Sequence, residues 1–205
     1  MTKYQQLAND SVLKTTGIIV TYGGRPIDSV YHADCGGATS SATSVWGGPA
    51  PPYLDGIVDE FCQRLNRPPW TLSIGRQALL DALNADSRTT VGPNLHDVMV
   101  MRRDSAGRAL TIQLSGSNEL TVTGATLRSV LADRFGFTRI KSTKLKIQKR
   151  NDYFLVTGTG FGHGAGLCQT GAMARAEAGH QTKQILAAYY PGTTLANFHK
   201  LPVQT

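Results

Sequence analysis

Glycine occupies every second position of the segment Gly158-Thr-Gly-Phe-Gly-His-Gly-Ala-Gly166. On an extended chain alternate residues lie on the same face, so these glycines would leave one face of a strand without side chains. Either a ligand or another segment of the chain must then approach that bare backbone closely. A helix is expected directly after the segment, and the free N–H groups at its start would favour an anion.

Two common nucleotide-binding loops do not fit this glycine-rich segment. A phosphate-binding P-loop ends in Gly-Lys-Ser or Gly-Lys-Thr, and the segment contains neither. A dinucleotide-binding loop has the spacing G-x-G-x-x-G, but here the third glycine position falls on His163 or Leu167. The polar side chains nearby are Thr157, Thr159, His163 and Gln169. The alternatives that remain are a binding loop and a packed strand-to-helix corner without a ligand.

The rest of the chain is typical of short strands and helices joined by turns. Residues 18–22 and 25–31 flank Gly23-Gly24, a pair that favours a tight hairpin. A long irregular stretch, residues 32–70, follows, and its two tryptophans indicate that it is packed and ordered. Ser73 is the expected cap of a helix over residues 76–83. Further strands are expected at 98–103, 110–114, 120–123, 144–149 and 153–157, and further helices at 124–135, 167–178 and 183–189.

Strands and helices are intermixed without the regular βαβ order of a parallel sheet, so the predicted fold class is α+β. No internal repeat and no linker rich in proline or serine divides the sequence. We therefore expect a single β-rich domain over residues 1–205, with antiparallel hairpins and a few short helices around a cleft.

The chain has a net charge of +7, which favours nucleic acid, an anionic membrane surface or an anionic wall polymer as a partner. Its one dense basic cluster, residues 141–150, alternates with apolar residues in an expected hairpin. Because no aromatic platform accompanies this cluster, nucleic acid is not an expected partner. The sequence shows no signal peptide and no run of roughly 18 apolar residues that would span a membrane. A cytoplasmic protein and the mature form of an exported one would both have these properties.

The three cysteines, Cys35, Cys62 and Cys168, include no C-x-x-C pair. Buried free thiols are the expected state, and a Cys35–Cys62 disulfide is the main alternative. A zinc site that also uses His32 or His163 is another alternative, although only His32 and Cys35 are close in sequence. A nucleophilic Cys–His pair is the last. We therefore predict neither a bound metal nor a cofactor.

Glycan cleavage commonly relies on a carboxylic acid that burial keeps protonated. The chain has three glutamates, Glu60, Glu119 and Glu177. Glu60 is expected beside a cleft, Glu119 in a turn and Glu177 on a solvated helix face. None of the three has a sequence setting that indicates a catalytic acid.

A series of short segments follows in a specific order along the chain: Tyr31-His-Ala-Asp-Cys-Gly-Gly-Ala-Thr39, Val45-Trp46, Pro52-Tyr53-Leu54, Asp59-Glu-Phe-Cys62, Gly124-Ala-Thr-Leu-Arg128, Ser142-Thr-Lys-Leu145, Gly160-Phe-Gly-His-Gly-Ala-Gly-Leu-Cys-Gln-Thr-Gly-Ala172, Ala178-Gly179 and Ile185-Leu-Ala-Ala-Tyr-Tyr-Pro-Gly-Thr193. In order and spacing they resemble the SpoIID/LytB domain family over about residues 10–200. This long composite is specific, although no single segment in it is.

The resemblance implies a peptidoglycan lytic transglycosylase or an amidase enhancer. Members of the family act on peptidoglycan glycan strands, classically strands stripped of their stem peptides, in sporulation or elsewhere in the bacterial cell envelope. Their cleavage is non-hydrolytic: a glutamic acid protonates the glycosidic oxygen, and the 6-hydroxyl of muramic acid then closes an anhydro ring. The expected partners are therefore glycan strands, with a cell-wall amidase as a second candidate. The expected location is the cell envelope or the outside of the cell.

The family's catalytic glutamate lies in a segment resembling Glu-Met-Pro, upstream of the part that residues 9–17 match. The expected domain lacks that N-terminal segment, so we assign no catalytic residue to this chain. The upstream zinc cluster of some members, a His and a Cys-x4-His-Cys, is also unmatched. The residues that carry over would line a glycan-binding cleft, and they are His32, Gly36, Gly37, His163, Gly164 and Gln169, with Tyr189 and Tyr190. The alternative is a peptidoglycan-binding or amidase-enhancing module without catalysis of its own.

Overall fold

The structure is a computed structural model that describes residues 2–198. In this range it contains seven α-helices, one short 3-10 helix and eleven strands in four small sheets. Three of the sheets are antiparallel, which confirms the predicted α+β class with its antiparallel strand pairs. No described helix combines the length and the apolar character needed to cross a membrane.

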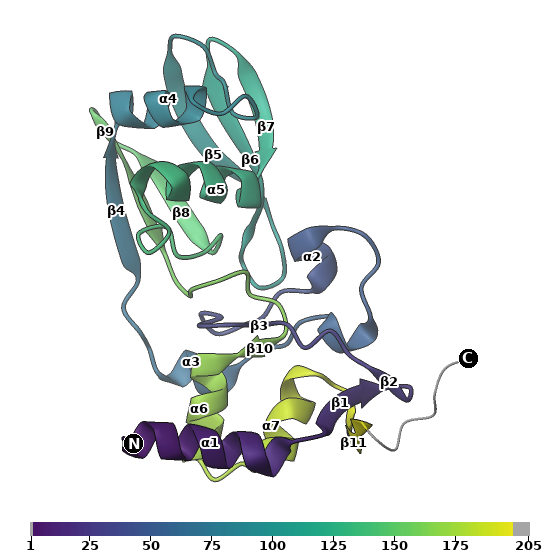
Figure 1. Ribbon diagram of the computed structural model, residues 1–205. Helices are drawn as coiled ribbons and strands as arrows, with labels where there is room; N and C mark the ends of the chain where they lie inside the picture. Colours follow the sequence, from purple (N-terminus) through teal and green to yellow (C-terminus); the bar gives the residue numbers. More distant parts are fainter. Residues whose placement is uncertain (1, 199–205) are drawn as a thin grey trace.

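The middle of the chain forms one lobe, the central lobe, drawn in blue, teal and green in the upper half of Figure 1. Its two antiparallel sheets have the strand orders β4-β9-β8 and β5-β6-β7, and helices α4 and α5 pack on them. Alternate residues of β4 are buried, and Leu72 and Ile74 join Leu79 and Leu83 of α4 in an apolar core. The elements are β4 (Trp70–Gly75), α4 (Arg76–Asn84), β5 (Leu95–Arg103), β6 (Ala109–Gly116), β7 (Glu119–Thr123), α5 (Gly124–Phe135), β8 (Leu145–Lys149) and β9 (Tyr153–Gly158).

Segments from both ends of the chain form a second lobe, the terminal lobe, in the lower half of Figure 1. A small antiparallel sheet places β1 between β2 and β11, and a parallel pair joins β3 to β10. Helices α3, α6 and α7 enclose a second core, which contains all three cysteines together with Tyr53, Tyr189 and Tyr190. The elements are β1 (Ile18–Tyr22), β2 (Arg25–Pro26), β3 (Tyr31–His32), α3 (Glu60–Arg64), β10 (Leu167–Cys168), α6 (Gln169–Glu177), α7 (Thr182–Tyr189) and β11 (Thr194–Asn197).

The long stretch between β3 and β4 is less irregular than expected, and of its two tryptophans Trp70 is buried while Trp46 is 55% exposed. It contains α2 (Ala42–Trp46), the 3-10 helix η1 (Pro52–Leu54) and α3. Neither α2 nor α3 was expected, and neither was α1 (Lys3–Thr15), which begins with a reciprocal capping box between Thr2 and Gln5. Helix α1 buries no residue, and its apolar side chains, Tyr4, Leu7 and Val12 among them, are exposed.

Two sequence expectations for these elements are wrong. Ser73 does not cap a helix; it lies inside β4, opposite Leu155 of β9, and α4 begins only after Gly75. Every second residue of β4 is buried, which is the spacing of a strand, and Ser73 occupies one of the exposed positions between them. The strand expected over residues 25–31 is interrupted after Pro26, because residues 31 and 32 leave the hairpin to pair with β10.

Candidate functional site at the glycine-rich loop

The glycine-rich loop, residues 159–166, joins β9 of the central lobe to β10 of the terminal lobe. Four of its residues have left-handed φ angles: Gly160 (75°), Gly162 (105°), Gly164 (91°) and Gly166 (68°). The expectation of an extended segment with one bare face is therefore wrong. Glycine alternates here because every second residue adopts a backbone conformation that strains other residue types.

The close approach that the glycines permit is made by another segment of the same chain. Asp34 and Phe161 exchange backbone hydrogen bonds of 3.0 Å and 2.7 Å. A Cβ atom added to Gly162 would lie 2.8 Å from Cβ of His32, and one added to Gly160 would lie 2.8 Å from the carbonyl oxygen of Asp34. The loop is thus packed against residues 32–36, and its two halves line two different cavities.

The larger cavity has a volume of about 870 Å³ and lies between the loop, α2, α5 and the strands β5 and β6. We call it the arginine cavity. Its charged lining residues are Arg102, Arg108, Arg128, Asp104 and Asp133. One of the two aspartates, Asp104, already accepts hydrogen bonds from the Ser40 hydroxyl and from the backbone N–H of Arg108. The cavity therefore carries an excess of positive charge.

An exposed tryptophan forms part of the arginine cavity wall. Trp46, the last residue of α2, packs its ring 5.0 Å from the ring of His163, measured between centroids. The residue is nevertheless 55% exposed, so one side of the indole remains open. A large, half-exposed aromatic surface beside polar groups is a common feature of ligand-binding sites.

The two histidines of the predicted site lie edge to face, with ring centroids 5.4 Å apart. Nε2 of His163 donates to the carbonyl oxygen of Tyr31 over 2.9 Å, and its Nδ1 accepts from the N–H of Ala165 over 3.2 Å. This pattern requires a neutral imidazole. Burial lowers the pKa of His163, and burial lowers the pKa of His32 to about 4. Both side chains are therefore neutral near pH 7.

Arg108 is a site residue that the sequence did not reveal. It is only 2% exposed; its Nη1 donates to the carbonyl oxygen of Gly162 over 3.0 Å, and Gly164 covers the guanidinium plane. Nε and Nη2 have no hydrogen-bond partner among the described residues. Burial lowers the pKa of Arg108, but arginine stays protonated in proteins. In the sequence Arg108 simply follows the turn after β5, and nothing in that turn indicates that the side chain is buried against the glycine-rich loop.

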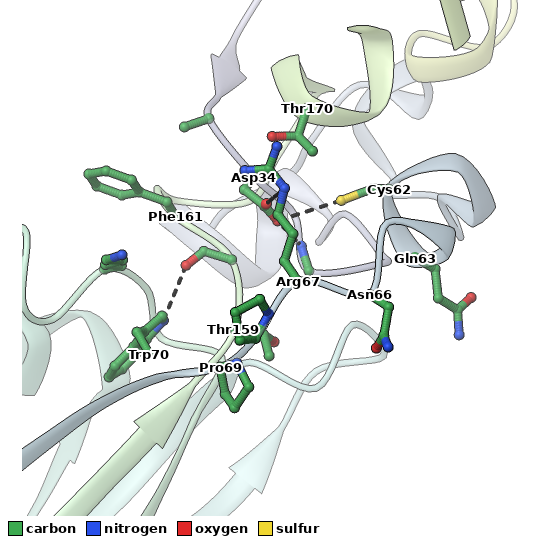
Figure 2. A pocket seen from close by; sticks show the side chains of 15 residues that line it. Asp34, Cys62, Gln63, Asn66, Arg67, Pro69, Trp70, Thr159, Phe161 and Thr170 are labelled. Atoms are coloured by element: carbon green, nitrogen blue, oxygen red, sulfur yellow. Dashed lines mark hydrogen bonds and ion pairs between the residues drawn. The ribbon is translucent and has the colours of Figure 1, made fainter. Parts of the chain in front are cut away.

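A smaller cavity, of about 700 Å³, is lined by residues 159–161 of the loop and is shown in Figure 2. We call it the Asp34 cavity. The indole N–H of Trp70 donates to the carbonyl oxygen of Gly160 over 3.2 Å, and Nε of Arg67 lies 3.8 Å from the Asp34 carboxylate. Burial raises the pKa of Asp34, and the Cys62 thiol also lies at hydrogen-bond distance from it.

The structure places four of the eight predicted cleft residues at the glycine-rich loop. His32, His163 and Gly164 lie around the centre of the loop, while Gly36 lines the Asp34 cavity. Gly37 packs against the Gln63 side chain, and its carbonyl oxygen accepts from the N–H of Asp59.

The other three predicted residues lie elsewhere. Gln169 is the exposed first residue of α6. Tyr189 and Tyr190 are each 2% exposed in the core of the terminal lobe. The Tyr189 hydroxyl donates to Asp59, and the Tyr190 hydroxyl donates to the carbonyl oxygen of Val30.

All three glutamates are on the surface. Glu60 pairs with Arg64 at the exposed start of α3, and Glu119 accepts from Gln113 and Ser115 at the end of a sheet. Glu177 is exposed on α6. Since burial is what keeps a carboxylic acid protonated at neutral pH, none of them has the environment of a general acid.

The three cysteines are free thiols, and the structure brings them together with Asp59 in the core of the terminal lobe. One ligand atom from each of the four residues lies within 4.8 Å of the others. Hydrogen bonds from the Cys168 and Cys35 thiols lower the pKa of Cys62. Of the described residues, these are the ones with a geometry that suits a metal ion.

A family model described as "Domain of unknown function (DUF8618)" matches residues 63–166, which are 104 of the 205 residues. The match spans the central lobe and the glycine-rich loop.

Several curated proteins are similar to nearly the whole chain. The amidase enhancer of Bacillus subtilis is 29% identical over 93% of this chain and 32% of its own length. Stage II sporulation protein D of Bacillus subtilis is 27% identical over 91% of this chain and 50% of its own length. An uncharacterized protein of Brachyspira hyodysenteriae is 29% identical over 93% of this chain and 49% of its own length. The chain thus spans half or less of the length of each of these relatives.

Proposed function

This chain belongs to the DUF8618 family and is a distant homologue of SpoIID and amidase-enhancer proteins, and on that basis we propose that it takes part in peptidoglycan processing. It binds glycan strands stripped of stem peptides, as the groove-bearing portion of a SpoIID-like lytic transglycosylase. The observation that carries the proposal is that homology extends over more than nine tenths of the chain and includes the loop that lines the two cavities.

The arginine cavity suits such a strand in size and chemistry. At about 870 Å³ it accommodates a few sugar rings, and the open side of Trp46 offers an apolar surface for one of them. Removal of the stem peptide leaves a free lactyl carboxylate on each muramic acid. The excess of arginine over aspartate in the lining favours that anion over an uncharged polysaccharide.

The chemical step needs a general acid, which the three exposed glutamates do not supply. The resemblance places the family's acid on a segment upstream of the matched positions. The same exposed glutamates support the second candidate function, a peptidoglycan-binding or amidase-enhancing module that acts on a cell-wall amidase. Both functions share the cell envelope as their location and the glycan strand as their ligand.

Binding is tested with glycan strands prepared with and without amidase treatment. The expected result is tighter binding of the stripped strands and a loss of roughly tenfold in affinity for Trp46→Ala, equivalent to about 1.4 kcal/mol. Tyr4→Ala is the matched control, since Tyr4 is an exposed aromatic residue on α1, outside the arginine cavity. Equal loss in both variants, or no preference for stripped strands, contradicts the proposal.

The two candidate functions differ in their products. The chain is incubated with stripped strands, and anhydro-muramic products are sought by mass spectrometry. Product formed by this chain alone overturns the non-catalytic alternative. If no product forms, a purified cell-wall amidase is assayed with and without the chain; stimulation supports the enhancing module, and no stimulation supports binding alone.

A further inference from the structure

Four potential metal ligands converge from three separate segments of the terminal lobe. Cys35 follows β3, Asp59 and Cys62 lie at the start of α3, and Cys168 ends β10. Their ligand atoms all lie within 4.8 Å of one another, and Sγ of Cys35 lies 3.5 Å from Oδ2 of Asp59. We propose that Cys35, Asp59, Cys62 and Cys168 bind one zinc-class divalent metal ion in a tetrahedral site.

The spacing of the four ligand atoms fits this geometry. Bonds of about 2.3 Å to sulfur and about 2.1 Å to oxygen place a sulfur and an oxygen ligand about 3.6 Å apart on a tetrahedral ion. The Cys35–Asp59 distance of 3.5 Å already agrees with that value. The remaining distances between ligand atoms are at most 4.8 Å, so small side-chain shifts would bring them to the tetrahedral value.

Hydrogen-bonding groups around the cluster orient the four ligands, as such groups do in structural metal sites. The backbone N–H groups of Cys35 and Gly171 point at Sγ of Cys168, over 3.2 Å and 3.4 Å. Both oxygens of Asp59 are held, Oδ2 by the Tyr189 hydroxyl at 2.6 Å and Oδ1 by Arg175 at 3.5 Å. Such second-shell hydrogen bonds fix the ligands and tune the metal.

The charges around the cluster also support an anionic metal centre. Three thiolates and a carboxylate around a dication leave a net charge of about −2. Arg175, whose side chain is only 12% exposed, contacts the Asp59 carboxylate. Lys144 is half-buried nearby and donates through Nζ to the carbonyl oxygen of Gly36 over 2.8 Å. These cations offset the charge that burial would otherwise disfavour.

A metal accounts for the four groups better than a disulfide does. A disulfide between any two of the cysteines would leave the third thiol unused, whereas a metal ion would engage all three thiols together with the fully buried carboxylate of Asp59. The ligands are between 0% and 6% exposed, so no open position for a substrate remains. The site is therefore structural, and it ties β3, α3 and β10 together, with Cys62 at the wall of the Asp34 cavity.

The first test uses the unmodified protein, prepared without chelator from cells grown with zinc. Elemental analysis is expected to give one zinc per chain. Thiol titration in denaturant without reductant is expected to give three thiols per chain. One thiol and no metal would show a disulfide, three thiols and no metal would show an unused cluster, and either result overturns the proposal.

The second test assigns the ligands. Replacement of zinc by cobalt is expected to produce the intense visible bands of a tetrahedral cobalt–thiolate centre. Cys168→Ser and Asp59→Asn are expected to bind cobalt at least tenfold more weakly, whereas Glu60→Gln, which changes the exposed neighbour of Asp59, is expected to bind normally. If a ligand variant fails to fold, chelator-dependent reactivity of the wild-type thiols still decides: equal reactivity with and without chelator contradicts the proposal. None of these measurements depends on glycan binding.

Discussion

The Tyr189 hydroxyl donates a 2.6 Å hydrogen bond to Oδ2 of Asp59 inside the core of the terminal lobe. The bond joins the end of α7 to the start of α3, and the ring of Tyr189 also lies 5.3 Å below the guanidinium of Arg175. We expect Tyr189→Phe to lower the free energy of unfolding by about 1–3 kcal/mol, because it leaves a buried charged acceptor with one partner fewer. Chemical denaturation measures this change.

The same variant separates two roles for the tyrosine. If Tyr189 acts only in the core, Tyr189→Phe binds stripped glycan strands with the affinity of the wild type at a temperature where both are folded. A loss of affinity in the folded variant would instead support the role that the family resemblance gave this residue. Tyr22→Phe is a suitable control, since Tyr22 is a partly exposed tyrosine at the end of β1.

The sequence predicted the class of fold and several strands and helices, because two-residue and helical spacings of apolar residues are local properties. It did not predict that β1 pairs with β11, since Ile18 and Asn197 meet only when the two ends of the chain come together. The parallel pairing of β3 with β10 was missed for the same reason.

The candidate site shows a similar division. The glycine-rich loop and the two histidines were visible in the sequence, whereas Arg108 was not, because it reaches Gly162 only through the packing of the two lobes. The sequence showed three cysteines but not that they lie together. Their convergence with Asp59 depends on contacts between α3 and α6 and between β3 and β10, and no short spacing announces it.

We expect the stability of the protein to fall on acidification through His163. Its neutral ring accepts the N–H of Ala165, and burial and the nearby Arg108 and Arg128 lower its pKa below the ordinary value of about 6.5. The unfolded chain therefore binds a proton at a higher pH than the folded chain. The stabilising effect is complete above about pH 6.5 and is lost as the pH falls through the lowered pKa.

Denaturation curves between about pH 7.5 and pH 5 test this prediction. The variant His163→Gln keeps a donor for the Tyr31 carbonyl but does not titrate, so its stability is expected to change less over this range. His32, whose pKa is also lowered, leaves a residual slope in the variant. Identical slopes in the two proteins would exclude His163 as a source of the pH dependence.

Glu60→Gln is expected to change neither stability nor any glycan cleavage that the chain supports. The carboxylate of Glu60 is 66% exposed and pairs only with Arg64, and such surface pairs contribute less than about 1 kcal/mol. The measurements are the denaturation midpoint and the yield of anhydro-muramic products. A large loss of product at unchanged stability would identify Glu60 as a catalytic acid.

Gly164→Ala tests whether the glycine-rich loop is specified by its backbone alone or also by Arg108. Gly164 has a φ angle of 91°, and an added Cβ would collide with the guanidinium of Arg108. Gly179 has a φ angle of 89° with open space around it, so Gly179→Ala measures the backbone strain alone, about 1–3 kcal/mol. We expect Gly164→Ala to cost at least about 1 kcal/mol more than this control, because the collision adds to the strain.

In an Arg108→Ala background that excess should disappear, since the atoms that collide are gone. Denaturation of the wild type, Gly164→Ala, Arg108→Ala and the double variant gives the coupling free energy between the two positions. If Gly164→Ala costs the same with and without the arginine, the guanidinium does not constrain the loop.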